Sequence, residues 1–254
     1  MNCLNCNSET TGSYCYNCGQ KTSTTRFSFK HIFKTDIANK FYSFFKNDLF
    51  FTLKELATRP GFSVREYIEG KRVNHMNYMS LYLLLSAAGI FLDKYAKVTE
   101  AVLNTNDDDS AKAISKYYEF VRDNPKTFIF ITIPVVSVFT FLFFKKSKFN
   151  FSEHLIMNVY KASAVLVITK IVTLLSILTS NLTFLKIVND LFGYVVFGYS
   201  VWFLYQFFYD NKIYSKLSIF SRTALSVLLG MLFSTIFMFI YWLIEFAITG
   251  QKIF

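Results

Sequence analysis

The sequence predicts an all-α integral membrane protein of about five transmembrane helices, preceded by a small zinc-ribbon-like knuckle and an amphipathic helical segment. Three observations support this fold class. Of the 254 residues, 53% are hydrophobic and only 17% are charged, against about 25% charged residues in a typical soluble domain. Long apolar runs follow one another after residue 75. All four cysteines lie near the N-terminus, in two CxxC pairs.

The knuckle, residues 1–22, contains Cys3-x-x-Cys6 and Cys15-x-x-Cys18. Each pair offers two sulfur ligands, and two pairs complete the tetrahedral shell that zinc prefers. The reducing cytoplasm argues against two disulfides. We therefore predict a structural zinc ion that folds a segment too small to have a core. Metal or redox sensing and an electron-transfer iron site are the alternatives.

Residues 23–75 form a basic, Phe-rich segment that we expect to be helical and cytoplasmic. Apolar residues recur at i+3 and i+4 along Lys40–Ala57, which predicts an amphipathic helix. This helix packs either against the protein's own helices or in the membrane interface. The Arg-Pro-Gly sequence at 59–61 predicts a break, and Ser63 is the expected N-cap of a short helix that ends at Gly70. The candidates for contact with lipid headgroups, or for anchors of the first span, are Arg59, Arg65, Lys71 and Arg72.

The transmembrane domain is predicted over residues 76–254. A helix needs about 20 residues to cross the hydrocarbon core. The last three apolar runs meet this length and the first two are marginal, whereas Leu182–Val188 is too short to cross. The predicted spans lie near residues 76–92, 127–144, 155–178, 191–209 and 225–248.

The basic residues of the loops predict the orientation. Residues 1–75 hold many Lys and Arg residues, and the short segments 145–153 and 210–222 add more. With five spans, these segments share one side, which the positive-inside rule assigns to the cytoplasm. We expect a cytoplasmic N-terminus and a C-terminus outside. The net charge of +10 then reflects basic residues beside anionic lipid, so the expected partners include membrane lipids and exclude nucleic acid.

Ionisable side chains within or beside the predicted spans are costly and mark candidate functional positions. At 100° per residue, His154, Asn158 and Lys161 share one face of the third span. Such a polar stripe serves either as a substrate or proton path, or as structural pairing and snorkelling. The candidate intramembrane polar residues are Glu153, His154, Asn158, Lys161, Lys170, Asp190 and Glu245.

Depth in the predicted membrane suggests one pairing among these residues. Lys170 lies on the face of the third span opposite to the stripe, at a level that allows it to pair with Asp190 or Glu245. Two glycines of the fourth span, Gly193 and Gly198, are expected to allow close packing of helices.

Three segments of the chain resemble domain-of-unknown-function family 3667, a family of uncharacterised bacterial membrane proteins. They are YCYNCGQK at Tyr14–Lys21 with the upstream cysteine pair, ELATRPGFSVREYIEGKRVNHMNYMSLYLLLS at Glu55–Ser86, and FSEHL at Phe151–Leu155. The resemblance supports a zinc knuckle and a multi-pass topology in the bacterial cytoplasmic membrane. It implies no reaction.

We interpret the sequence as a non-enzymatic docking or regulatory protein, with a possible protein partner at its cytoplasmic zinc knuckle. A small transporter, channel or lipid-handling protein that uses the intramembrane polar residues is one alternative. A membrane enzyme is another, with Glu153 and His154 performing acid–base chemistry. The sequence contains no GxSxG, HExxH or phosphate-binding Gly loop that would favour an enzyme.

Overall fold

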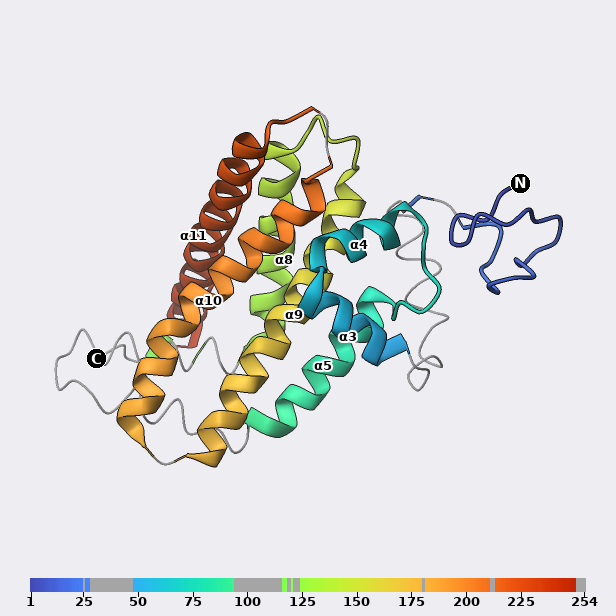
Figure 1. Cartoon of the computed structure of the whole chain (residues 1–254). Helices are drawn as coiled ribbons and strands as arrows, with labels where there is room; N and C mark the ends of the chain where they lie inside the picture. Colours follow the sequence, from blue (N-terminus) through green and yellow to red (C-terminus); the bar gives the residue numbers. More distant parts are fainter. Residues whose placement is uncertain are drawn as a thin grey trace.

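The computed structural model describes residues 1–24, 26–27, 48–93, 116–117, 120, 124–179, 181–210 and 213–249. Apart from isolated bridges in the knuckle, the regular structure within these residues is helical, which confirms the all-α class. The helices are α3 (Asp48–Thr58), α4 (Pro60–Glu69), α5 (Tyr78–Asp93), α8 (Pro125–Phe143), α9 (Phe151–Leu178), α10 (Leu182–Phe208) and α11 (Lys216–Thr249) (Figure 1).

Three of these helices are long and apolar enough to cross a membrane: α9, α10 and α11. The apolar helix α5 and the apolar part of α8 are shorter. Many large apolar side chains lie exposed on the long helices, such as Leu178, Leu191 and Ile244. Exposing such an apolar surface to water is unfavourable, whereas exposing it to the hydrocarbon of a bilayer is favourable. The chain therefore has the helix lengths and the surface of a membrane protein.

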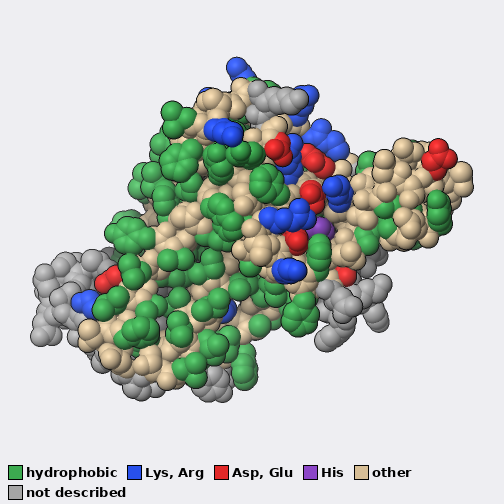
Figure 2. Space-filling model, viewed as in Figure 1, with side chains coloured by type: hydrophobic (Ala, Val, Ile, Leu, Met, Phe, Trp, Pro, Cys, Tyr) green, Lys and Arg blue, Asp and Glu red, His purple; other side chains and the backbone are tan. Residues whose placement is uncertain are grey.

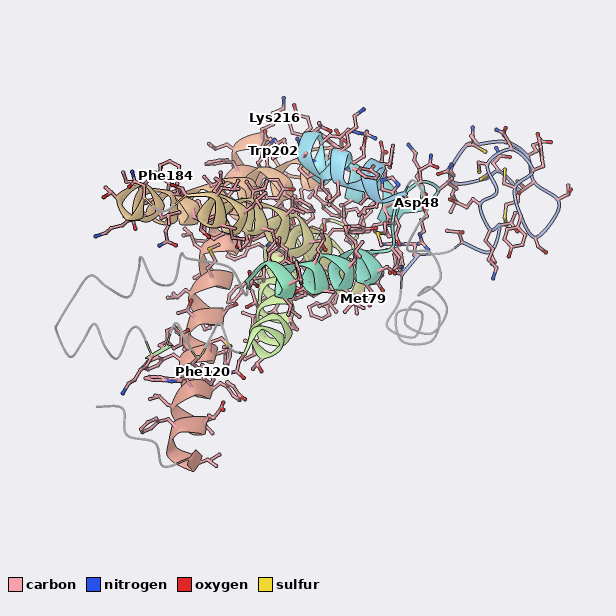
Figure 3. All side chains as sticks on the ribbon, turned by 90° about the horizontal axis from the view of Figure 1, so that it is seen from below. Asp48, Met79, Phe120, Phe184, Trp202 and Lys216 are labelled. Atoms are coloured by element: carbon pink, nitrogen blue, oxygen red, sulfur yellow. The ribbon has the colours of Figure 1, made fainter. Side chains whose placement is uncertain are left out.

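The helices form two groups that meet at one end of the molecule. α5, α9 and α10 lie side by side, and α8 pairs with α11. In Figure 3, α11 runs steeply away from α10, so their far ends lie apart. The ends of α8 and α10 and the starts of α9 and α11 lie at the same end of the molecule (Figure 1), where α4 packs against α10 and α9. We call this the α4 end.

The boundary between α3 and α4 lies where the Arg-Pro-Gly sequence predicts it. Pro60 occupies the first turn of α4, where its missing N–H costs no helical hydrogen bond. The helix therefore starts before Ser63, and the prediction that Ser63 is an N-cap is wrong: its N–H donates to Arg59 O at 3.0 Å within the helix. Gly70 ends the helix with φ 121°. Residues 40–47 of the predicted amphipathic helix lie outside the described residues, and the remainder belongs to α3.

The third and fourth apolar helices begin earlier than predicted, because asparagine caps set their starts. Asn150 and Glu153 form a capping box before α9. Asn181 Oδ1 accepts from Phe184 N–H at 3.1 Å and caps α10. The run Leu182–Val188, expected to be separate from the fourth span, is thus the first part of α10.

Helix α4 lies against the end of α10 and requires a glycine at the contact. Gly61 N–H donates to Gln206 Oε1 at 3.1 Å. A Cβ atom at Gly61 would lie 2.2 Å from Phe203 O, a backbone atom. The expectation of close packing at Gly193 and Gly198 is wrong within the described residues, because a Cβ atom there would meet nothing within 4 Å.

We predict that Gly61→Ala lowers the melting temperature of the purified protein by several degrees. Alanine favours a helix over glycine by about 1 kcal/mol, but displacing a packed backbone costs about 1–3 kcal/mol or more, so the steric term exceeds the propensity gain. Thermal unfolding in detergent measures the effect. Gly198→Ala in α10 is the control and should not destabilise the protein, since its site is open. Equal effects of both changes would refute the close contact.

Candidate metal centre

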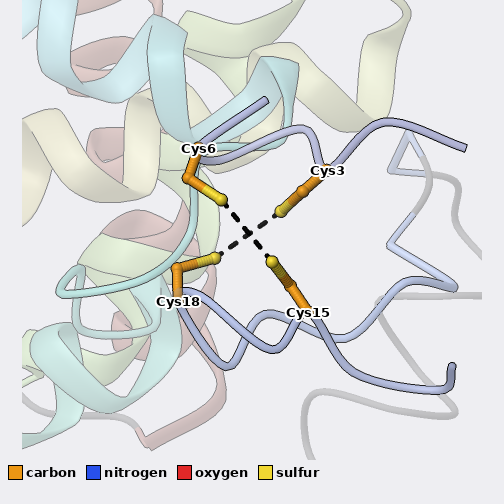
Figure 4. A group of neighbouring side chains, drawn as sticks. All are labelled: Cys3, Cys6, Cys15 and Cys18. Atoms are coloured by element: carbon orange, nitrogen blue, oxygen red, sulfur yellow. Dashed lines mark hydrogen bonds between the residues drawn. The ribbon is translucent and has the colours of Figure 1, made fainter. Parts of the chain in front are cut away.

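The four cysteines converge on one point in the knuckle (Figure 4). Their Sγ atoms all lie within 4.8 Å of one another. Cys3 Sγ is 3.6 Å from Cys18 Sγ, and Cys6 Sγ is 3.5 Å from Cys15 Sγ. Metal–sulfur bonds of about 2.3 Å place the sulfurs of a tetrahedron about 3.8 Å apart. The described cysteines can therefore hold one metal ion in a four-sulfur shell.

The two cysteine pairs are built by the same backbone turn. In the first, Asn7 N–H donates to Cys3 O, and in the second, Gly19 N–H donates to Cys15 O, each at 2.9 Å. Asn7 and Gly19 both have positive φ, 61° and 72°, a conformation that Gly and Asn tolerate best. The sequence analysis did not identify this repeat, although Cys-x-Asn-Cys followed by Asn or Gly occurs twice.

Local hydrogen bonding prepares one ligand for metal binding. Ser8 Oγ lies 3.4 Å from Cys6 Sγ. The Ser8 side chain is the main cause that lowers the pKa of the Cys6 thiol to about 6. Metals bind the thiolate form, so the lowered pKa of Cys6 favours metal binding.

A single glutamine attaches the knuckle to the loop after α4. Gln20 Nε2 donates to Gly70 O at 2.8 Å, and Gln20 Oε1 accepts from Arg72 N–H at 3.1 Å. Leu4 packs over Gly70, so a Cβ atom there would lie 2.7 Å from its Cδ1. Gln20 is buried. No spacing or charge pattern in the sequence marks it as an anchor.

An aromatic contact forms the second attachment. Phe27 is buried and stacks on Tyr67, with their ring centroids 5.7 Å apart. It also meets the edge of Tyr78 at 6.1 Å. The Arg72 guanidinium lies 3.8 Å from the Phe27 ring centroid, which is a cation–π geometry.

An ion pair joins this N-terminal segment to the start of α9. Arg26 Nε and Nη2 donate to the two carboxylate oxygens of Glu153 at 2.9 and 2.5 Å. Glu153 is only 1% exposed and also accepts from Asn150 N–H in the capping box. Asn150 Nδ2 donates to Phe27 O at 2.9 Å. The Glu153 hydrogen bonds raise the pKa of Arg26, which therefore stays charged. Sequence analysis missed Arg26 and treated Glu153 as an intramembrane candidate.

The four basic residues predicted to meet lipid headgroups all contact protein groups. Arg72 donates from Nε to Tyr67 O at 3.3 Å, beside its aromatic contacts. The other three form ion pairs: Arg59 with Glu55 and Glu66, Arg65 with Glu69 and Asp210, and Lys71 with Glu66.

Two members of the predicted polar stripe lie between α8 and α9. His154 Nδ1 is 3.2 Å from Thr140 Oγ1. Asn158 Nδ2 donates to Thr140 Oγ1 and to Ser137 Oγ, each at 3.1 Å. All four side chains are buried. Lys161 is buried too, but it has no hydrogen bond or ion pair within the part of the chain that the structure describes.

The predicted partners of Lys170 are wrong. Its Nζ lies 2.6 Å from Asp93 Oδ1, at the last residue of α5. Its aliphatic part crosses Gly89, where a Cβ atom would lie 2.5 Å from Lys170 Cε. Because α5 lies beside α9, the nearest carboxylate belongs to the first apolar helix. Asp190 is exposed on α10, and Glu245 is partly buried on α11.

Ser63 of α4 contacts His75, which lies beside Tyr67, the residue on which Phe27 stacks. Ser63 Oγ is 2.9 Å from His75 Nε2. The His75 ring lies between Phe51 and Tyr67, at centroid distances of 5.1 and 5.8 Å. Burial lowers the pKa of His75 below its usual value.

These observations define a helical protein of the membrane type with an N-terminal four-cysteine cluster that can hold a metal ion. Residues 47–88 match the sequence model of the family described as protein of unknown function (DUF3667). The predicted resemblance is thereby confirmed, over α3, α4 and most of α5. Comparison with curated proteins and with solved structures finds no match.

We predict one bound metal ion per chain in protein purified under reducing conditions. Cys15→Ser/Cys18→Ser removes two of the four ligands and should reduce the metal content at least tenfold. Elemental analysis measures this ratio. Helical circular dichroism should stay unchanged, because the long helices do not contain the site. Wild-type protein without stoichiometric metal would refute the assignment.

We predict that His75 makes stability depend on pH. The folded-state pKa lies below the unfolded value of 6.5, so the unfolded chain takes up the proton first as the pH falls. The His75 contribution is therefore present above pH 6.5 and is lost below it. Between pH 7.5 and 5.5, the melting temperature should fall by a few degrees less in His75→Gln than in wild type. An identical fall in both proteins would argue against this effect.

Proposed function

We propose that this is a five-span protein of the bacterial cytoplasmic membrane whose knuckle holds a structural zinc ion and docks a protein partner on the cytoplasmic side. The supporting observation is that the knuckle projects from the helical body (Figures 1 and 2) while it remains attached through Gln20 and Phe27. A projecting, anchored module can meet a partner without disturbing the apolar helices.

Zinc suits the site because all four ligands are sulfur and no position is left for a substrate. A closed four-sulfur shell is typical of structural zinc. The lowered pKa of Cys6 favours binding at neutral pH. The closed shell also argues against a catalytic metal, which needs an open position.

The free surface of the knuckle supports docking. Tyr14 and Tyr16 are 62% and 83% exposed, and Leu4 is half exposed. Tyrosine is enriched in protein interfaces and in their energetic centres. We therefore expect a protein partner with an apolar pocket that accepts these two rings.

The arrangement of the ends supports the five-span topology and its orientation. Each apolar helix from α5 to α11 reverses the direction of the one before it (Figure 1). The short segment with Lys145 and Lys146 and the first turns of α11 with Lys216 and Arg222 lie at the α4 end, where blue side chains gather in Figure 2. The positive-inside rule assigns that end to the cytoplasm.

We expect a partner to co-purify with wild-type protein from native membranes and to be lost in two different variants. Cys15→Ser/Cys18→Ser removes the metal site, and Tyr14→Ala/Tyr16→Ala removes the exposed rings while zinc is retained. The yield of the partner, measured by quantitative mass spectrometry, should fall at least tenfold in both. Phe50→Ala is the matched control, because Phe50 is an exposed aromatic residue on α3. A partner retained by the tyrosine variant would contradict this docking surface.

A further inference from the structure

A pocket of about 480 Å³ opens at the α4 end, between α4, the start of α9 and the end of α10. It is separate from the metal centre, and the proposed docking function does not use it. Its lining combines charged side chains with a wall of apolar ones. This combination is typical of a site for an amphiphilic ligand.

Two donors in the lining lack a hydrogen bond to any described residue. Ser147 is 5% exposed, and its Oγ makes no hydrogen bond to any described residue. Arg65 Nη1 is buried and also lacks a hydrogen bond, although Asp210 Oδ2 lies 3.5 Å away. Buried donors without acceptors are destabilising, so native structures rarely keep them. The Ser147 hydroxyl, beside an Arg65 Nη1 that has only a long ion pair, indicates an acceptor that a ligand supplies.

A cation without an ion pair to any described residue lies beside these donors. Lys148 lines the pocket from the segment between α8 and α9, and its side chain is exposed. Its φ of 67° is unusual for lysine. An ammonium, a guanidinium and a hydroxyl together match the oxygens of a phosphate group.

The acidic groups of the lining fall into two kinds. Glu153 is fully engaged by Arg26 and by the cap of α9. Glu69 and Asp210 share Arg65 but keep half or more of their side chains exposed. Three basic and three acidic residues leave the pocket with no net charge. A ligand with both a phosphate and an ammonium group therefore fits better than a simple anion.

The apolar wall suits an organic substituent on the phosphate. Ile68, Phe207 and Phe208 form its buried part, and Ile213 lies exposed at the edge. Inorganic phosphate would leave this wall unused. The pocket lies where the apolar helices end, which is the level of lipid headgroups in the proposed topology.

We propose that this pocket binds an amine-bearing phosphoester of the phosphoethanolamine class. Ser147, Lys148 and Arg65 bind the phosphate, and Glu69 and Asp210 bind the ammonium group. The same chemistry occurs in the headgroup of phosphatidylethanolamine and in soluble phosphoethanolamine compounds, and the experiment below distinguishes these sources.

The test uses the full-length protein in a detergent without phosphate. Short-chain phosphatidylethanolamine and glycerophosphoethanolamine are titrated separately, and binding is measured by calorimetry. Glycerophosphoglycerol, which has the phosphate but no amine, is the comparison ligand. We expect the ethanolamine compounds to bind at least tenfold more tightly than the glycerol compound. Tighter binding of the lipid than of its headgroup identifies a membrane lipid as the ligand, and equal binding identifies a soluble phosphoester.

Three variants connect the binding to this pocket. Ser147→Ala should weaken binding about tenfold without lowering the melting temperature of the ligand-free protein, because the hydroxyl has no partner to lose. Lys148→Asn should weaken binding by a similar factor, since Asn removes the charge and tolerates positive φ. Lys146→Asn is the matched control and should bind normally, because Lys146 lies outside the lining. Binding that is absent from wild type, or unchanged by Ser147→Ala and Lys148→Asn, would overturn the proposal. This outcome does not depend on whether the knuckle docks a protein partner.

Discussion

The buried carboxylate of Glu153 holds the α4 end together. A buried charge is tolerated only when it is paired and hydrogen-bonded. Glu153 meets this condition through Arg26, which comes from the distant N-terminal segment, and through the N–H of Asn150 in the cap of α9. Each partner is thereby fixed in place. The N-terminal segment cannot leave without stranding the charge, and α9 cannot start at another residue without losing its cap.

The ion pair between Arg26 and Glu153 is one of the contacts that fasten the knuckle, a small module without a core of its own, to the helical body. Two cysteine pairs can fold the knuckle around a metal, but apart from Leu4 over Gly70 the described contacts with the helical body come from other residues. Those contacts come from the residues that follow: Gln20 bonds to the backbone after α4, and Phe27 enters the aromatic cluster with Tyr67 and Tyr78. The matched family segment, residues 47–88, contributes the receiving side of both contacts.

The sequence was sufficient for features that depend on local pattern, and insufficient for those that depend on which helices are neighbours. Cysteine spacing and apolar run length predicted the four-sulfur cluster and the long helices. The partner of Lys170 was missed because depth along a span does not say that α5, with Asp93, lies beside α9. The cap at Ser63 was mistaken because Pro60 can start a helix as well as interrupt one. Gln20 and Ser147 carry no local signal, because their importance arises from tertiary contacts alone.

Buried polar atoms without partners do not all have the same meaning in this protein. His154 Nε2 and Asn158 Oδ1 also lack partners among the described residues, but they lie between α8 and α9, where Phe141 and Phe208 pack against the His154 ring. The lining of the pocket beside α4 does not include them. Ser147 and Arg65 differ because their donors, which lack a hydrogen bond to any described residue, line an open space beside the exposed Lys148. A ligand that enters this pocket can reach those donors, which is why the binding proposal rests on the pocket and not on the polar stripe of α9.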